Sequence, residues 1–336
     1  MKFLNGVILT IVLVACTSVY AGAAGEAKTA AAKPNAGKNN GDYVGTDTCI
    51  TCHDLQYKHF KNTVMGKVFA NPRTAAQKLG CEACHGPGKA HVEAGGGKDT
   101  IPIRFGKDSR NTAEEQNAAC LTCHQRGNRL FWKASPHQSR GMTCVDCHQV
   151  MQNLQPTLIG EARFNAPLSE INAVKKSQPE LCFQCHQMRR AQLQRSSHMP
   201  FREGKVTCTS CHNPHGSPNP SLLIQATLNE NCYSCHAERR GPFLWAHPPV
   251  TENCGTCHDV HGSTNPQLLK VRTPRLCQQC HTTSAHGGFP GGNVLAGPTG
   301  SSQQVGYNSR VLNRGCTNCH SKIHGTNATS GKFFIR

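Results

Sequence analysis

Ten copies of the pentapeptide CxxCH run through this chain of 336 residues and constrain its fold more than any other feature. CxxCH is the attachment signature of c-type haem, in which two thiols add to the haem vinyl groups and the adjacent histidine faces the iron. The pattern predicts ten covalently bound c-type haems. The motifs are numbered 1 to 10 in chain order, and the predicted thioether cysteines are Cys49, Cys52, Cys81, Cys84, Cys120, Cys123, Cys144, Cys147, Cys182, Cys185, Cys208, Cys211, Cys232, Cys235, Cys254, Cys257, Cys277, Cys280, Cys316 and Cys319.

Zinc binding and a disulfide framework are the competing interpretations of this cysteine pattern. Zinc ribbons combine two CxxC halves around each metal and need no histidine directly after the second cysteine. A histidine follows all ten pairs in this chain, which favours haem.

Composition supports covalent cofactors, because the chain has 12 Phe, 5 Tyr and 2 Trp among 37% hydrophobic residues, beside 32 Gly and 19 Pro. A globular chain of this length normally buries a larger aliphatic and aromatic core. Haem groups would replace the missing material. We therefore expect mainly short α-helices and loops wrapped round a chain of ten haems, with little or no β-sheet.

The amino terminus has the features of an export signal: an early lysine, an apolar run and then small residues. Two cleavage sites compete, one after a signal peptide of residues 1–21, the other after a lipoprotein signal of residues 1–15 that leaves Cys16 lipidated. Residues 22–42 read as a flexible linker rich in Ala, Gly, Lys and Asn. Residues 43–336 then form the haem domain, with five two-haem units.

The formal net charge of +17 would suggest nucleic acid or an anionic membrane as a partner in many proteins. Ten haems, however, carry about twenty propionate carboxylates, which Lys and Arg can neutralise. No basic tract is interleaved with stacking aromatic residues, so we expect no nucleic-acid binding.

The histidines divide into two sets of nearly equal size. The ten motif histidines are the predicted proximal ligands: His53, His85, His124, His148, His186, His212, His236, His258, His281 and His320. Nine others recur at repeat positions and are the predicted distal ligands: His59, His91, His137, His198, His215, His247, His261, His286 and His324. A residue three to six places after a proximal histidine cannot easily reach the opposite face of the same haem, so we expect it to bind a neighbouring one.

Met151 is the predicted tenth distal ligand. It lies three residues after His148, where His215 and His261 follow His212 and His258. A thioether binds haem iron and raises its reduction potential relative to a second imidazole. The alternative is that Met151 only fills space, which leaves that iron to Met142, a lysine, water or no ligand.

Several longer stretches resemble one family: CEACHGPG from Cys81, NPHGS from Asn213, CYSCHAERRGPFLWAHPPVTENCGTCH from Cys232, LCQQCH from Leu276 and HGTNATSGK from His324. Over residues 43–336 the chain resembles the MtrA/DmsE family of periplasmic decahaem cytochromes, which includes MtoA-like and PioA-like members. The departure is Met151, where the family pattern has histidine.

The resemblance implies a mostly bis-histidine haem wire inside an outer-membrane β-barrel porin. Its other partners would be periplasmic or inner-membrane cytochromes and an outer-surface cytochrome or mineral. Members serve metal reduction, iron(II) oxidation or dimethyl sulfoxide respiration. We therefore expect a periplasmic electron carrier associated with the outer membrane and no catalytic residues.

Two other functions stay open on the sequence alone. A multihaem reductase needs an iron with an open distal position, which this chain has only if Met151 is not a ligand. A free periplasmic electron shuttle has the same haem chemistry and lacks the porin.

Overall fold

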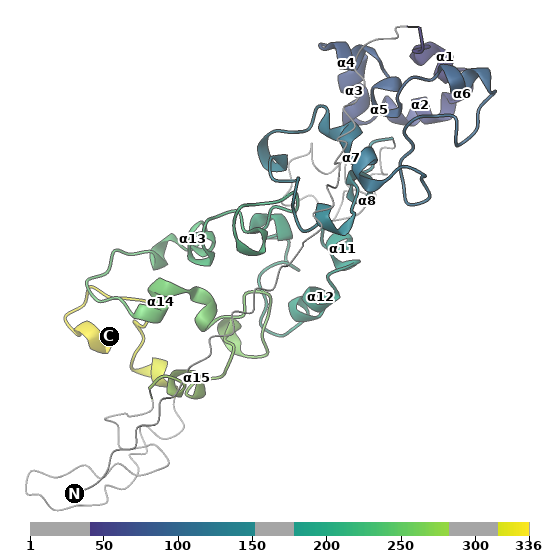
Figure 1. Ribbon diagram of the computed structural model, residues 1–336. Coiled ribbons are helices and arrows are strands. Elements are labelled where there is room, and N and C mark those ends of the chain that lie inside the picture. Colours follow the sequence, from purple (N-terminus) through teal and green to yellow (C-terminus); the bar gives the residue numbers. More distant parts are fainter. Residues whose placement is uncertain (1–40, 152–177, 282–314, 336) are drawn as a thin grey trace, which may run out of the picture. The chain divides into compact units, whose positions relative to one another are not determined.

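The computed structural model describes residues 41–151, 178–281 and 315–335, all within one compact unit that runs from Gly37 to Arg336. Figure 1 shows short helices joined by loops. The described residues contain no β-strand, only isolated bridges such as the one between His212 and Leu223. The predicted fold class is confirmed. The predicted signal peptide, Cys16, nearly all of the predicted linker and His286 lie outside the described residues.

The α-helices are α1 (Thr46–Ile50), α2 (Asp54–Phe60), α3 (Val64–Ala70), α4 (Ala75–Lys78), α5 (Glu82–His85), α6 (Lys89–Glu93), α7 (Ala113–Leu121), α8 (Cys144–Cys147), α11 (Gln178–Phe183), α12 (Gln187–Leu193), α13 (Leu228–Tyr233), α14 (Pro248–Glu252) and α15 (Arg275–Gln278). Single 3₁₀ turns lie at η1 (Gly127–Arg129), η2 (Gln138–Arg140), η4 (Cys208–Ser210), η5 (Pro220–Leu222), η6 (Ala237–Arg239), η7 (Cys254–Thr256), η8 (Pro266–Leu268), η9 (Cys316–Asn318) and η10 (Gly331–Phe333).

Polar caps start several of these helices. The Thr112 side chain accepts a hydrogen bond from Glu115 N at the start of α7, and the Glu115 side chain accepts from Thr112 N in return. At the start of α13 the Thr227 side chain likewise accepts a hydrogen bond from Glu230 N. Such caps satisfy amide groups that a short helix leaves free. They place a helix start just ahead of motifs 3 and 7.

All ten motifs adopt the same backbone turn. In each motif the histidine N–H donates to the carbonyl of the first cysteine, over 2.8 to 3.2 Å. This is one turn of α-helix, which brings the histidine and the first cysteine to the same side of the chain. The turn therefore presents a thiol and an imidazole together.

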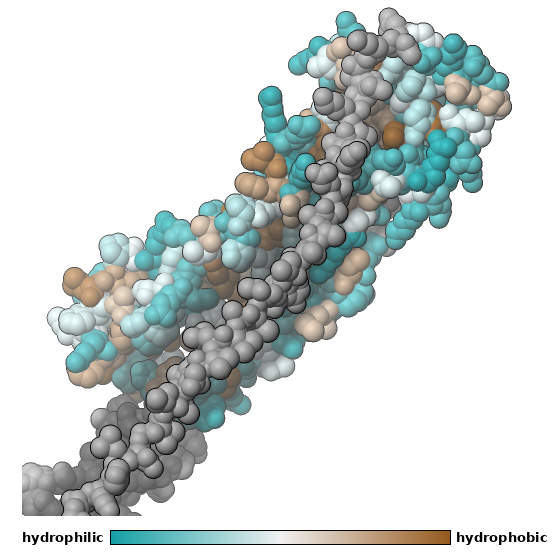
Figure 2. All heavy atoms as spheres, in the orientation of Figure 1, coloured by the Kyte–Doolittle hydropathy of each residue, from teal (hydrophilic) through white to brown (hydrophobic). Residues whose placement is uncertain are grey.

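Very little apolar side chain is buried in the described part of the chain. Trp132 and Leu193 are its buried hydrophobic residues, whereas Leu244 is 79% exposed and Met188 is 72% exposed. Figure 2 shows hydrophobic residues set among hydrophilic ones along the visible face. A protein of this size needs more buried apolar surface to be stable. The chain is therefore suited to wrap large apolar groups that it binds.

Candidate haem-iron sites

The first cysteines of adjacent motifs meet in pairs. The Cys120 thiol makes a hydrogen bond with the Cys144 thiol, and the Cys182 thiol with that of Cys208, which raises the pKa of Cys120 and of Cys182. The same contact joins Cys49 to Cys81, Cys232 to Cys254 and Cys277 to Cys316. We call the five pairs units I to V, made of motifs 1 and 2, 3 and 4, 5 and 6, 7 and 8, and 9 and 10.

Second cysteines of adjacent units lie near each other at three of the four junctions. Burial raises the pKa of the Cys84 thiol, and the Cys123 charge adds to the rise. The pKa of Cys211 is raised by burial and by the charge on Cys235. The pKa of Cys257 is raised by burial and by the charge on Cys280. First cysteines therefore make contact within a unit, and second cysteines of adjacent units lie near each other at three junctions. Wherever these contacts are described, spatial neighbours are also neighbours in the sequence.

Polar side chains ahead of a unit's first motif hold the two motifs of that unit together. The buried Asn117 accepts from Cys144 N through Oδ1 and donates to Met142 O through Nδ2. Asn229 does the same with Cys254 N and with Val250 O. Sequence analysis missed these residues, although a polar residue three places before the first cysteine recurs in units I, II and IV.

Motif histidines lie opposite other histidines in six ring pairs. Five pairs have ring centres 5.9 to 6.3 Å apart and planes within 11° to 20° of parallel: His53 with His91, His148 with His215, His212 with His261, His247 with His281 and His258 with His324. The sixth pair, His137 with His186, has centres 6.3 Å apart and planes at 72°.

These separations leave room for a metal ion between the rings. Two imidazoles on opposite sides of one ion, each bound through a bond of about 2.0 Å, have ring centres about 6 Å apart. The described residues contain no group of three or more His, Cys, Asp and Glu side chains that could hold a metal ion. Paired rings without further protein ligands suit an ion whose other ligands belong to a porphyrin.

Hydrogen bonds orient many of these rings through Nδ1. His85, His212, His258 and His320 donate Nδ1–H to the backbone carbonyls of Ile103, Ser221, Gln267 and Phe333, over 2.6 to 3.0 Å. A carbonyl only accepts, so the proton is on Nδ1 and the Nε2 lone pair is free for a metal. The arrangement fixes both the tautomer and the direction of the ring.

Burial favours the neutral form of four predicted distal histidines, which is the form that binds a metal. It is the largest cause that lowers the pKa of His215 to about 4, and the charge on His148 is the next largest. It also lowers the pKa of His261 to about 4, with Arg189 as the next largest cause. The pKa of His247 and of His324 is lowered by burial as well.

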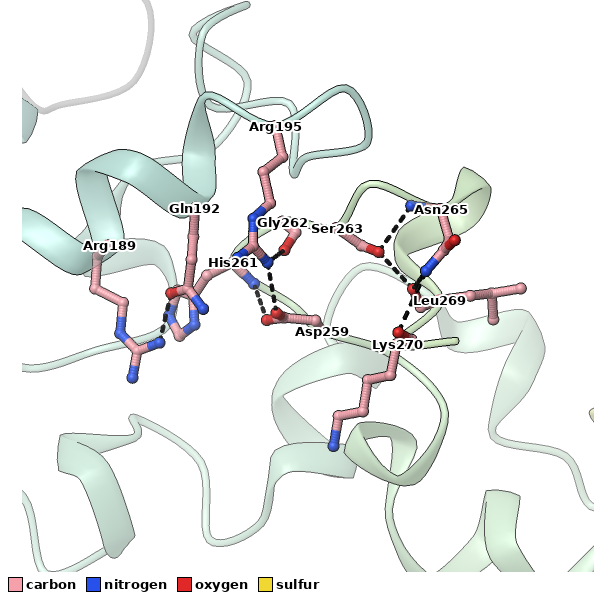
Figure 3. Close-up of polar contacts among 10 residues, drawn as sticks. All are labelled: Arg189, Gln192, Arg195, Asp259, His261, Gly262, Ser263, Asn265, Leu269 and Lys270. Atoms are coloured by element: carbon pink, nitrogen blue, oxygen red, sulfur yellow. Dashed lines mark hydrogen bonds and ion pairs between the residues drawn. The ribbon is translucent and has the colours of Figure 1, made fainter. Parts of the chain in front are cut away.

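Around His261 the chain builds a tight loop (Figure 3). Asp259 Oδ1 accepts from His261 N at 3.3 Å, and Arg195 Nη1 donates to Gly262 O at 3.0 Å. Ser263 accepts from Asn265 N, and the Asn265 amide donates to Leu269 O and to Lys270 O. His261 is therefore held from both sides.

Three predicted distal ligands among the described residues belong to none of the six ring pairs. His59 is exposed on α2. His198 contacts Arg195 O through Nδ1 at 2.9 Å and Glu203 Oε1 through Nε2 at 3.1 Å. Met151 is half-buried and is the last described residue before position 178.

Comparisons with known proteins give several partial family matches and one long one. A model described as a doubled CXXCH motif matches residues 198–241 and 247–286. Models described as cytochrome c-type protein NrfB-like, cytochrome c552, and cytochrome c554 and c-prime match residues 81–163, 128–200 and 17–86. The multihaem cytochrome MtrA of Shewanella baltica (strain OS185) is 44% identical over 295 residues, which cover 87% of this chain and 81% of that protein.

Proposed function

Since the chain belongs to the MtrA family of multihaem c-type cytochromes, we propose that it is an electron conduit across the outer membrane, sheathed by a β-barrel porin. When bound, c-type haems supply reversible one-electron carriers. The full set would be ten haems, one at each motif. The conduit would serve extracellular iron(II) oxidation or the reduction of metals and minerals.

The observation that carries this proposal is the thiol contact that joins the first cysteines of the two motifs in each of the five units. These contacts hold the two motifs of each unit together. At three of the four junctions the second cysteines of adjacent units lie near enough for their charges to interact. Each motif fixes one haem edge through its thioethers, so neighbouring thiols place haem edges close together. A wire needs such a series of neighbouring motifs, whereas a catalyst needs one accessible iron.

Paired axial ligands support the same proposal. In each of the six ring pairs a motif histidine would bind iron on one side and its partner would bind on the other. Two strong ligands leave no position for a substrate. The side chains thus favour electron transfer over nitrite, hydroxylamine or sulfoxide reduction.

A polar haem wire needs a partner to cross a bilayer. In the described residues no helix is long and apolar enough to span a membrane. Backbone at membrane depth must be enclosed by protein, and a closed barrel provides that enclosure. We place the mature chain at the periplasmic side of the outer membrane, with lipidation at Cys16 as a second means of attachment. Its donors or acceptors would be periplasmic or inner-membrane cytochromes and an outer-surface cytochrome or mineral.

Reconstitution tests the proposal. Tagged holoprotein is extracted from outer membranes in detergent, and any co-purifying β-barrel is identified and inserted with it into liposomes that enclose a reduced viologen dye. External ferric citrate should oxidise the dye when cytochrome and barrel are both present, and not with the barrel alone. Recovery of the cytochrome without a barrel, by osmotic shock, would instead indicate a free shuttle.

A further inference from the structure

The histidines that follow motifs 6, 8 and 10 pair with the preceding unit rather than with their own. His215 follows motif 6 and lies opposite His148 of motif 4, at 5.9 Å. His261 follows motif 8 and lies opposite His212 of motif 6, at 6.1 Å. His324, after motif 10, lies opposite His258 of motif 8, at 6.3 Å. Each of these three histidines thus lies opposite a motif histidine one unit nearer the amino terminus.

Histidines between the two motifs of a unit are displaced the other way. His137 of unit II lies opposite His186 in unit III, and His247 of unit IV lies opposite His281 in unit V. The amino-terminal unit has no predecessor, and there His91, after motif 2, pairs with His53 of motif 1.

Close backbone packing decides which unit each loop histidine reaches. A Cβ built on Gly216, next to His215, would lie 2.0 Å from Phe131 O of unit II, and one on Gly262, next to His261, would lie 2.1 Å from Gln192 O of unit III. Each glycine lets its loop dock on the preceding unit. The docked loop then carries its histidine to that unit's second motif.

Met151 begins a loop of the same design. The sequences from Asn213 (NPHGSPNPSLLI), from Asp259 (DVHGSTNPQLLK) and from Gln149 (QVMQNLQPTLIG) all have a proline five places after the donor and two aliphatic residues soon after it. His148, just ahead, is in an isolated β-bridge, as His212 and His258 are. The motif-4 loop therefore shares the bridge, the proline and the aliphatic pair with the other two, and differs in having Gln152 where they have Gly216 and Gly262.

We propose that Met151 Sδ binds the iron of motif 2, opposite His85, and not the iron of motif 4 that its own motif attaches. The assignment rests on the two-sided axial ligation of the proposed function. It is the one-unit displacement seen for motifs 6, 8 and 10, and the iron of motif 4 would already have His148 and His215. The His85 ring is fixed by Ile103 O at 3.0 Å, so its Nε2 is directed to one iron.

This assignment moves the high-potential haem. A thioether opposite histidine raises the reduction potential relative to two imidazoles. The haem with the raised reduction potential would be that of motif 2, where Cys84 lies near Cys123 of unit II, instead of a haem inside unit II. The second motif of unit I would hold an electron more tightly than its bis-histidine neighbours.

Near-infrared magnetic circular dichroism of the oxidised holoprotein tests the assignment, because a thioether on ferric haem gives a charge-transfer band of its own. The band should be present in the native protein and in Met142→Leu, and absent in Met151→Leu. Replacing Cys81 and Cys84 by serine, which removes haem attachment at motif 2, should abolish it. The same replacement of Cys144 and Cys147 at motif 4 should leave it in place.

The reverse pattern of loss, or no band in the native protein, would overturn the assignment. If a cysteine variant fails to assemble, a crystal structure of the native holoprotein decides between the two irons by the distance from each to Met151 Sδ. The dye oxidation in liposomes does not depend on which iron Met151 binds. Failure of this assignment is thus distinguishable from failure of the conduit.

Discussion

The loop that follows motif 6 (residues 213–224) and the loop that follows motif 8 (residues 259–270) are two copies of one structure that dock by different contacts. In both, the first side chain accepts from the donor histidine N–H, at 3.1 Å from Asn213 and 3.3 Å from Asp259. Beyond this they diverge. Asn213 Nδ2 donates to Asn128 O of unit II at 2.8 Å, whereas Asp259 pairs with Arg195 at 3.5 Å.

A second difference concerns the donor between the two motifs of the preceding unit. Pro214 O, in the motif-6 loop, accepts from His137 Nδ1 at 2.7 Å, and the His137 ring lies opposite His186. The corresponding histidine beside the motif-8 loop, His198, instead contacts Arg195 O and Glu203. Loop donors are therefore placed by a backbone shape that repeats, and donors between motifs by individual contacts.

The shared glycine should be the most sensitive point. Gly216→Ala puts a methyl group 2.0 Å from Phe131 O at a φ of +114°, so the loop must move away from unit II. We expect His215 to leave the iron of motif 4 and the holoprotein to lose more than about 2 kcal/mol of unfolding free energy. Electron paramagnetic resonance should then detect one high-spin ferric haem.

Gly106→Ala is the matched control, since Gly106 has a φ of +112° and nothing within 4 Å of an added Cβ. It should cost about 1 kcal/mol and leave all the haems low-spin. Equal effects of the two changes would show that backbone conformation matters and close docking does not.

Replacing the first side chain of each loop should destabilise the motif-6 loop more than the motif-8 loop. Asn213→Asp keeps the acceptor for His215 N and loses the donor to Asn128 O, where it leaves two oxygens facing each other. We expect a loss of about 1 to 2 kcal/mol in unfolding free energy, measured by thermal unfolding of the holoprotein. An unchanged melting temperature would mean that the Asn128 contact does not help to dock this loop.

Loop donors and donors between motifs also differ in ring orientation, which spectroscopy can detect. The loop donors His215 and His261 have planes 11° and 12° from those of their partners, whereas His137 and His186 are at 72°. Near-perpendicular imidazoles on ferric haem give a highly anisotropic low-spin signal, distinct from the rhombic signal of parallel rings. Electron paramagnetic resonance of the oxidised protein should show this signal, and His137→Ala should remove it. If the anisotropic signal persisted in His137→Ala, it would belong to a haem other than the one between His137 and His186.

The smallest effect is expected at the ion pair of the motif-8 loop. Arg195 and Asp259 lie 3.5 Å apart with side chains 43% and 25% exposed. Asp259→Asn keeps an acceptor for His261 N and removes only the charge, so we expect about 0 to 1 kcal/mol, and less in high salt. A loss as large as that of Asn213→Asp would show that the charge, and not the shared glycine, docks this loop.

The sequence predicts the fold class because each motif carries its own turn and because a chain so poor in apolar residues has few alternatives. The expected short helices carry or flank motifs 3, 5 and 7 as α7, α11, α12 and α13. The destination of each donor could not be predicted, since it depends on which backbone a loop docks against, as Gly216 does on Phe131 O. Asn117 and Asn229 were missed because a buried amide that bridges two motifs looks, in sequence, like an ordinary helix residue.

A crystal structure of the holoprotein, with the irons located by anomalous scattering, tests the central claim that distal donors are exchanged between neighbouring units. The account predicts iron between His148 and His215 and between His212 and His261, with Met151 opposite His85. Irons bound on both sides by residues of a single unit, throughout units II to IV, would contradict it.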